Sequence, residues 1–157
     1  MKFRSPDLPA PGRLFMHSMP GQREPLVDVL HSVQALDIRQ VFCLAPMDEI
    51  KHKSPEYYST LSDKLSCDIT MLPIPDFGVP TDVAAFWGAI DQIATTLRAG
   101  ANVLVHCAGG IGRTGTVAVG VAIRLGMTHA DALAAVKAEG SGPETSQQRA
   151  LVSRLPI

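Results

Sequence analysis

The chain has 157 residues, about the size of one globular domain, and we expect a single domain over residues 1–157 with 1–12 as an extended lead-in. Hydrophobic residues make up 46% of the chain and charged residues 18%, a composition that excludes intrinsic disorder. Fourteen Lys and Arg against fifteen Asp and Glu leave a net charge of -1, so neither nucleic acid nor an anionic membrane is expected as a partner.

Apolar patterning in the first half of the chain predicts strands that alternate with helices. Between residues 26 and 36, apolar side chains recur every three or four positions, which is the spacing of an amphipathic helix. The other elements expected here are an edge strand over 13–18, a buried strand over 41–45, one helix around 57–61 and a strand near 69–74.

The second half begins with a loop, because residues 73–82, PIPDFGVPTD, contain three prolines and a glycine. Thr81 or Asp82 can then cap a helix that ends near Gly100. The apolar residues 103–105 predict a central strand covered on both faces. Helices are expected over 114–125, from Thr128 onward and over 144–155. This order predicts an α/β fold with a central, mostly parallel sheet of about four to five strands flanked by helices.

The three cysteines, Cys43, Cys67 and Cys107, include no C-x-x-C pair and fit neither a disulfide framework nor a zinc cluster. They indicate reduced thiols and therefore a cytoplasmic protein, which we expect to be a monomer. The N-terminal stretch is broken by prolines and lacks the apolar core of a signal peptide. No apolar run approaches the roughly 18 residues of a membrane span, so we expect no membrane partner.

The segment VLVHCAGGIGRTGT, residues 103–116, joins the central strand to a helix through a glycine-rich loop. Gly110, Gly112 and Gly115 spell G-x-G-x-x-G, which by itself indicates a dinucleotide site. That fold also needs an acidic residue at the end of a second strand, and the residues after Gly115 predict helices instead. A Walker-type loop is excluded because it needs a lysine where Arg113 stands.

Cys107 and Arg113 bracket the same loop in a pattern that suits a phosphate group. A loop at a helix N-terminus points its backbone N–H groups inward, and the helix dipole adds positive charge. Arg113 can bind two phosphate oxygens at once. Such surroundings favour the thiolate form of a cysteine, so Cys107 is a candidate nucleophile toward phosphorus. The alternative is an inert buried thiol.

A phosphate-ester hydrolase also needs a group that protonates the leaving oxygen and later activates a water. Asp76 in the proline-stiffened loop is the candidate. It follows an apolar strand that we expect beside residues 103–105, which would bring it to the same edge of the sheet. The alternative is an ordinary turn aspartate.

The stretch HCAGGIGRT, residues 106–114, matches the signature H-C-x5-R-[ST], and the chain resembles the cysteine-based protein phosphatases. Within that superfamily it is similar to the atypical dual-specificity phosphatases, most of all the kinase-associated phosphatase type. The likeness extends to four further stretches, namely MPG near residue 20, VFC at 41–43, PIPDFGVPTD, and GSGPETSQQ from Gly140. It implies a phosphatase P-loop between a central strand and a helix.

The resemblance implies a role for each residue of the motif. Cys107 would be the nucleophile, Arg113 would bind phosphate and the transition state, and Asp76 would be the general acid and then the base. Thr114 would stabilise the thiolate as it leaves, and His106 would orient the loop and tune the thiol. The phosphate cradle would be the amides of Ala108, Gly109, Gly110, Ile111, Gly112 and Arg113. Members of the family need no metal, and we expect no cofactor.

Several departures from the family pattern bear on which substrates are expected. Glu144 stands where classical tyrosine phosphatases have a water-positioning glutamine, while Gln148 matches a later glutamine. The lysines of phosphoinositide phosphatases are absent, since Ala108 and Ile111 occupy those places. The chain is also too short for the long elements that deepen a phosphotyrosine-only pocket. We expect hydrolysis of phosphotyrosine and of phosphoserine or phosphothreonine, in a phosphorylated protein or a small phosphate ester.

Three alternatives stay open at this point. The chain could be a catalytically weak phosphate-binding module, or a phosphatase that acts on a non-protein phosphate. It could also perform thiol redox chemistry, in which Cys43 at the end of a neighbouring strand forms a protective disulfide with Cys107. Glu49 is a candidate support for Arg113, and Tyr57 and Tyr58 are expected to serve packing rather than the substrate rim.

Overall fold

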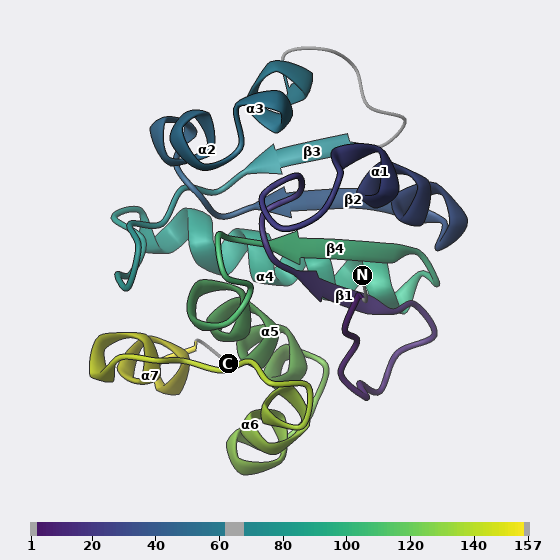
Figure 1. The fold of residues 1–157 in the computed structure, drawn as a ribbon. Helices are drawn as coiled ribbons and strands as arrows, with labels where there is room; N and C mark the ends of the chain where they lie inside the picture. The colour runs from purple at the N-terminus through teal and green to yellow at the C-terminus, as the bar shows by residue number, and fades with distance from the viewer. Residues whose placement is uncertain (1–2, 62–67, 156–157) are drawn as a thin grey trace.

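The computed structural model describes residues 3–61 and 68–155, which form a parallel sheet with helices on both faces (Figure 1). The strands lie in the order β1-β4-β2-β3, and all three strand pairings are parallel. The strands are β1 (Leu14–His17), β2 (Ile38–Cys43), β3 (Asp68–Met71) and β4 (Asn102–His106). The helices are α1 (Leu26–Ala35), α2 (Met47–Lys53), α3 (Pro55–Leu61), α4 (Val83–Arg98), α5 (Gly112–Arg124), α6 (His129–Lys137) and α7 (Ser146–Ser153).

Alternation of side chains along the strands divides the core between the two faces of the sheet. Phe15, Val41 and Leu104 point to one face, where they pack with the apolar side of α1. Their neighbours along the same strands, such as Met16 and Val105, point to the other face and pack with α4 and α5. The continuous apolar run of β4 therefore marks a central strand buried on both faces, as its sequence predicts.

The predicted α/β fold is confirmed, and most expected elements are present. Asp82 caps α4, with its Oδ1 accepting a hydrogen bond from Ala85 N at 2.9 Å. Thr128 caps α6 in the same way through Asp131 N. Within the described part of the chain, no helix is both long and apolar enough to span a membrane.

One helix was expected around residues 57–61, and the structure has two helices in this region. α3 contains these residues, and α2 lies directly before it. The break falls at Ser54, where φ is -148° and ψ is 77°. Pro55 disfavours a helical conformation in the residue before it. Ser54 Oγ also donates a hydrogen bond to Pro20 O at 2.8 Å, which ties the break to the loop after β1.

The expectation that the strand before Asp76 lies beside β4 is wrong. Among the strands of the described residues, that strand, β3, pairs only with β2, which separates it from β4. The chain continues past the end of β2, where Leu72 N donates to Cys43 O and Ile74 N donates to Leu44 O. Asp76 therefore still reaches the edge of the sheet where β4 ends.

Several element ends also differ from those expected. β3 stops at Met71 because Pro73 and Pro75 cannot donate to a ladder. α5 begins at Gly112 rather than Thr114, so Arg113 lies in its first turn. α7 begins at Ser146, since Thr145 caps it by accepting from Gln148 N at 3.1 Å.

Candidate active site

The loop between β4 and α5, residues 107–111, holds a buried thiol at its centre. Cys107 is 2% exposed, and its Sγ accepts hydrogen bonds from Gly110 N at 3.2 Å and from Thr114 Oγ1 at 3.1 Å. Both donors favour a sulfur that carries negative charge. The structure thus brings the expected Cys107, Thr114 and loop glycines together around one sulfur atom.

Gly110 has to be glycine for two reasons. Its φ is +75°, in the left-handed region that side chains disfavour. A Cβ at this position would also lie 2.7 Å from the backbone carbonyl of His17. The glycine allows the loop to curl tightly against the end of β1.

Arg113 is buried beside the thiol and is held by Glu49. Its Nη1 and Nη2 donate to the two carboxylate oxygens of Glu49 at 3.0 and 2.8 Å, and Nη1 also donates to Ile74 O at 3.0 Å. Burial opposes the charged guanidinium, but Glu49 and the nearby Cys107 and Asp76 more than offset it and raise the pKa of Arg113. The expected support by Glu49 is confirmed.

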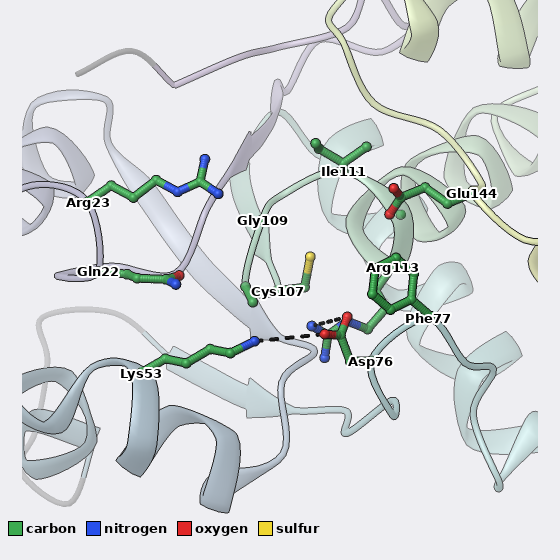
Figure 2. A pocket seen from close by; sticks show the side chains of 12 residues that line it. Gln22, Arg23, Lys53, Asp76, Phe77, Cys107, Gly109, Ile111, Arg113 and Glu144 are labelled. Carbon is green, nitrogen blue, oxygen red and sulfur yellow. Dashed lines mark ion pairs between the residues drawn. The ribbon is translucent and has the colours of Figure 1, made fainter.

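Asp76 reaches the same place from the loop after β3. Its carboxylate forms ion pairs with Arg113 Nη2 at 3.1 Å and with Lys53 Nζ at 3.8 Å (Figure 2). The Asp76 side chain is 48% exposed, whereas the Arg113 side chain is 2% exposed. The acid candidate therefore lies at the mouth of the pocket and the arginine at its wall.

These residues line a cavity of about 230 Å³. Figure 2 shows Cys107 between Gln22 and Arg23 on one side and Arg113 and Glu144 on the other. The pocket is also lined by residues that were not predicted from the sequence: Gln22, Arg23, Lys53 and Phe77. No local pattern marks them, because they come from the loop after β1, the end of α2 and the loop after β3, which meet only at the carboxyl ends of the strands.

His106 lies fully buried behind the loop. Its Nε2 is hydrogen-bonded to Tyr57 Oη at 2.8 Å, and its Nδ1 lies 3.2 Å from Cys107 O. Burial lowers the pKa of His106 to about 4, so the imidazole is neutral at neutral pH. It can orient the loop but adds no positive charge there. Tyr57 is likewise buried, which confirms the expected packing role and adds a hydrogen bond.

The neutral, buried state of His106 predicts a loss of stability in acid. The unfolded chain binds this proton near pH 6.5, whereas the folded chain binds it only near pH 4. As the pH falls through this window, the unfolded state binds more protons than the folded state. The free energy of unfolding therefore decreases by about 3 kcal/mol. Urea unfolding at pH 7.5 and pH 4.5 should show this loss in the wild type and a much smaller one in His106→Gln. The same change at the exposed His129 should leave the wild-type loss intact.

Glu144 and Gln148 take different places near the pocket. Glu144 lines the cavity, and its carboxylate packs so closely over Gly112 that a Cβ there would overlap it. Gln148 is buried, accepts from Glu144 N at 2.8 Å and donates to Gly78 O at 3.0 Å. Gln148 therefore ties α7 to the loop that carries Asp76.

Cys43 is buried at the end of β2, where it pairs in register with His106. Its Sγ lies 3.7 Å from Ala45 O, and burial raises the pKa of the Cys43 thiol to about 12. Cys43 is therefore an unreactive thiol at neutral pH, and a disulfide with Cys107 stays a prediction. Cys67 lies outside the described residues.

The Glu49–Arg113 pair predicts a combined loss of stability and activity in Glu49→Gln. Removing the Glu49 charge takes away charged hydrogen bonds of the buried guanidinium and leaves Asp76 as its remaining carboxylate partner, at a cost of about 2 kcal/mol in unfolding free energy. Because Glu49 would no longer accept both hydrogen bonds that orient the Arg113 guanidinium, kcat/KM should also fall by about tenfold. Chemical unfolding and steady-state hydrolysis of an aryl phosphate measure the two effects. Asp48→Asn, in the same turn of α2 but exposed, is the matched control, and equal behaviour of the two variants would contradict this prediction.

Comparisons with known proteins agree with this geometry. Cyclin-dependent kinase inhibitor 3 from Rattus norvegicus is 44% identical over 46 residues, which are 29% of this chain and 21% of that protein. The matched stretch thus spans about a fifth of the length of the curated relatives.

Two solved structures share the fold along nearly the whole chain. One is kinase associated phosphatase with its catalytic site cysteine replaced by serine, with a TM-score of 0.83, 18% identity, and coverage of 97% of this chain and 92% of that chain. The other is the active form of Tk-PTP, with a TM-score of 0.73, 28% identity, and coverage of 97% and 95%.

A family model described as "Swiss Army Knife protein, DSP-PTPase phosphatase domain" matches residues 7–154. That range contains the loop around Cys107, the arginine that flanks it and the loop that carries Asp76. The chain belongs to this PTP-SAK family of dual-specificity and tyrosine phosphatase domains.

Proposed function

We propose that this chain is a cysteine-dependent phosphomonoesterase that works through a phosphocysteine intermediate. The observation that carries the proposal is the convergence of Cys107 and Arg113, from the loop before α5 and its first turn, and Asp76, from the loop after β3, on one cavity of about 230 Å³. The hydrogen bonds from Gly110 N and Thr114 Oγ1 to Cys107 Sγ support a thiolate at its centre.

In the first step, Cys107 Sγ attacks phosphorus and the bond from phosphorus to the leaving oxygen breaks. The leaving oxygen takes the electron pair of that bond and a proton from Asp76. The loop amides and Arg113 bind the three equatorial oxygens, whose charge is greatest in the transition state. Because Asp76 is ion-paired with Arg113, an arriving phosphate has to displace its carboxylate.

In the second step, a water oxygen attacks phosphorus and the bond from phosphorus to sulfur breaks. The electron pair returns to Cys107 Sγ, where the Thr114 hydroxyl at 3.1 Å stabilises the re-formed thiolate. The Asp76 carboxylate accepts the proton of the water. Glu144 lines the same cavity.

The proposed substrates are phosphotyrosine and phosphoserine or phosphothreonine monoesters. Phe77 and Ile111 line the cavity yet remain 62% and 41% exposed, which supports an apolar rim that tolerates different side chains. The proposal includes a monomer that needs no metal. It also includes a reducing compartment such as the cytoplasm, because the mechanism requires Cys107 as a free thiol.

Hydrolysis of an aryl phosphate in the presence of EDTA tests the proposal. We expect a bell-shaped dependence of kcat/KM on pH with a mildly acidic optimum, and competitive inhibition by vanadate. Phosphotyrosine and phosphothreonine peptides should both be hydrolysed. Vanadate binding without turnover would instead identify a phosphate-binding module. Turnover of small phosphate esters alone would point to a non-protein substrate.

A further inference from the structure

Arg4 comes from the extended lead-in, far in sequence from the phosphate loop. Its backbone is fixed beside β1 by an antiparallel bridge, with Arg4 N donating to Met16 O at 3.0 Å and Met16 N donating to Arg4 O at 2.7 Å. The side chain extends from this anchor to the outer side of the loop around Cys107. An anchored arginine loses less entropy when it forms further hydrogen bonds.

The guanidinium of Arg4 joins three segments of the chain. Nη2 donates to Gly110 O at 2.6 Å, while Nη1 donates to Ser141 Oγ at 2.6 Å and to Glu139 O at 3.1 Å. Ser141 Oγ in turn donates to Gly110 O at 2.7 Å. The carbonyl of Gly110 therefore accepts two hydrogen bonds from outside the loop.

The direction of that carbonyl determines the direction of a loop amide. In a trans peptide the C=O of Gly110 and the N–H of Ile111 lie in one plane and point opposite ways. With Gly110 O held outward by Arg4 and Ser141, the Ile111 N–H points toward the cavity that Ile111 lines. A flipped peptide would turn a carbonyl oxygen toward the phosphate and repel it. Glycine at position 110 makes such a flip sterically easy.

The charge of Arg4 also acts on the site. Among the residues that the structure describes, no carboxylate forms an ion pair with Arg4, so its charge is not neutralised by direct contact. Burial lowers the pKa of Arg4 and the nearby Arg23 adds to this, while the interactions with Cys107 and Glu139 partly offset the lowering. The positive charge of Arg4 is thus attracted to negative charge at the site.

We propose that Arg4 is a positioning residue that holds the Gly110–Ile111 peptide in its anion-binding orientation, with Ser141 as the second donor. The proposal rests on the function proposed above, because it assigns Arg4 to the phosphate cradle of that site. It places a determinant of phosphate affinity outside the signature loop and at the opposite end of the domain sequence.

Four variants separate the geometry from the charge. Arg4→Met removes both, Arg4→Lys keeps the charge but lacks the planar fork that spans three acceptors, and Ser141→Ala removes only the second donor. Arg13→Met is the matched control, because Arg13 stacks on the Phe15 ring at 4.8 Å and does not contact the loop. Thermal unfolding identifies the variants that fold.

The measurements are vanadate affinity, kcat/KM for an aryl phosphate, and the pH at which half of Cys107 reacts with iodoacetamide, followed on its own peptide by mass spectrometry. For Arg4→Met we expect vanadate affinity and kcat/KM each to fall about tenfold, with the alkylation midpoint moved to higher pH. Arg4→Lys should lose affinity to a similar extent but keep the wild-type midpoint. Ser141→Ala should lose about threefold in affinity.

A folded Arg4→Met protein with wild-type vanadate affinity would overturn the proposal, and so would an equal loss in Arg13→Met. If Arg4→Met does not fold, wild-type affinity in both Arg4→Lys and Ser141→Ala would overturn it instead. A wild type that binds vanadate but does not hydrolyse phosphate esters would refute the proposed function alone, since the affinities still test Arg4. A wild type that binds no oxyanion would refute both.

Discussion

Replacing Cys107 by serine is expected to abolish turnover while leaving the phosphate site intact. The thiolate is the attacking group, and a serine hydroxyl in the same place has neither its charge nor a base that could remove its proton. Loss of a nucleophile lowers kcat on the order of 10⁴-fold or more. The loop amides and Arg113 are unchanged, so the affinity for inorganic phosphate should stay within about threefold. Steady-state kinetics and inhibition by phosphate measure both quantities.

Cys43→Ser is the matched control, because it makes the same chemical change in a buried thiol on the neighbouring strand. It should retain turnover, since Cys43 is not part of the cavity. Residual activity of Cys107→Ser comparable to the wild type would contradict the mechanism. A phosphorylated Cys107 peptide, trapped by rapid acid quench of the wild type, would identify the covalent intermediate directly.

The phosphate loop was predictable because its essential residues are close in sequence. Cys107, Arg113 and Thr114 lie within eight consecutive positions between a strand and a helix, and local geometry brings them together. The parallel sheet was predictable for a related reason: strands of apolar residues alternate with amphipathic helices, and such units pack in few ways.

Asp76 was predicted correctly as a site residue, but one of the two reasons for the prediction was wrong. The proline-rich loop correctly marked it as positioned near the strand ends, but the strand adjacency inferred for it does not exist. Its approach to Arg113 depends on how the chain after β3 continues across the end of β2, through bonds such as Ile74 N to Leu44 O. Strand order is a property of the whole sheet, and no local pattern specifies it.

Other contacts in the site cannot be predicted from local sequence patterns. Tyr57 meets His106 across 49 positions, and Arg4 meets Gly110 across 106. No local pattern distinguishes Tyr57 or Arg4, and only the packed fold brings the two pairs within hydrogen-bond distance. The break between α2 and α3, in contrast, was predictable from the local sequence. Pro55 disfavours a helical conformation in the residue before it, which indicates a helix end at Ser54.

Replacing Asp76 by asparagine is expected to separate catalysis from binding. The amide has the same shape but cannot donate an acidic proton to the leaving oxygen, so kcat should fall by about 10²- to 10⁴-fold. Leaving groups that depart without a proton need the acid least. The loss should therefore be smaller for 4-nitrophenyl phosphate than for phenyl phosphate, and largest for phosphothreonine.

Binding should move the other way in the same variant. The Asp76 carboxylate forms an ion pair with Arg113 Nη2 at 3.1 Å and should therefore compete with phosphate for it. A neutral amide competes less, so inorganic phosphate should bind as tightly as in the wild type or a few-fold more tightly. Asp82→Asn is the matched control: it lies in the same loop, and asparagine also caps a helix. Equal losses of kcat for all three leaving groups would show that Asp76 does not protonate the leaving oxygen, and weaker phosphate binding would show that its carboxylate does not compete for Arg113.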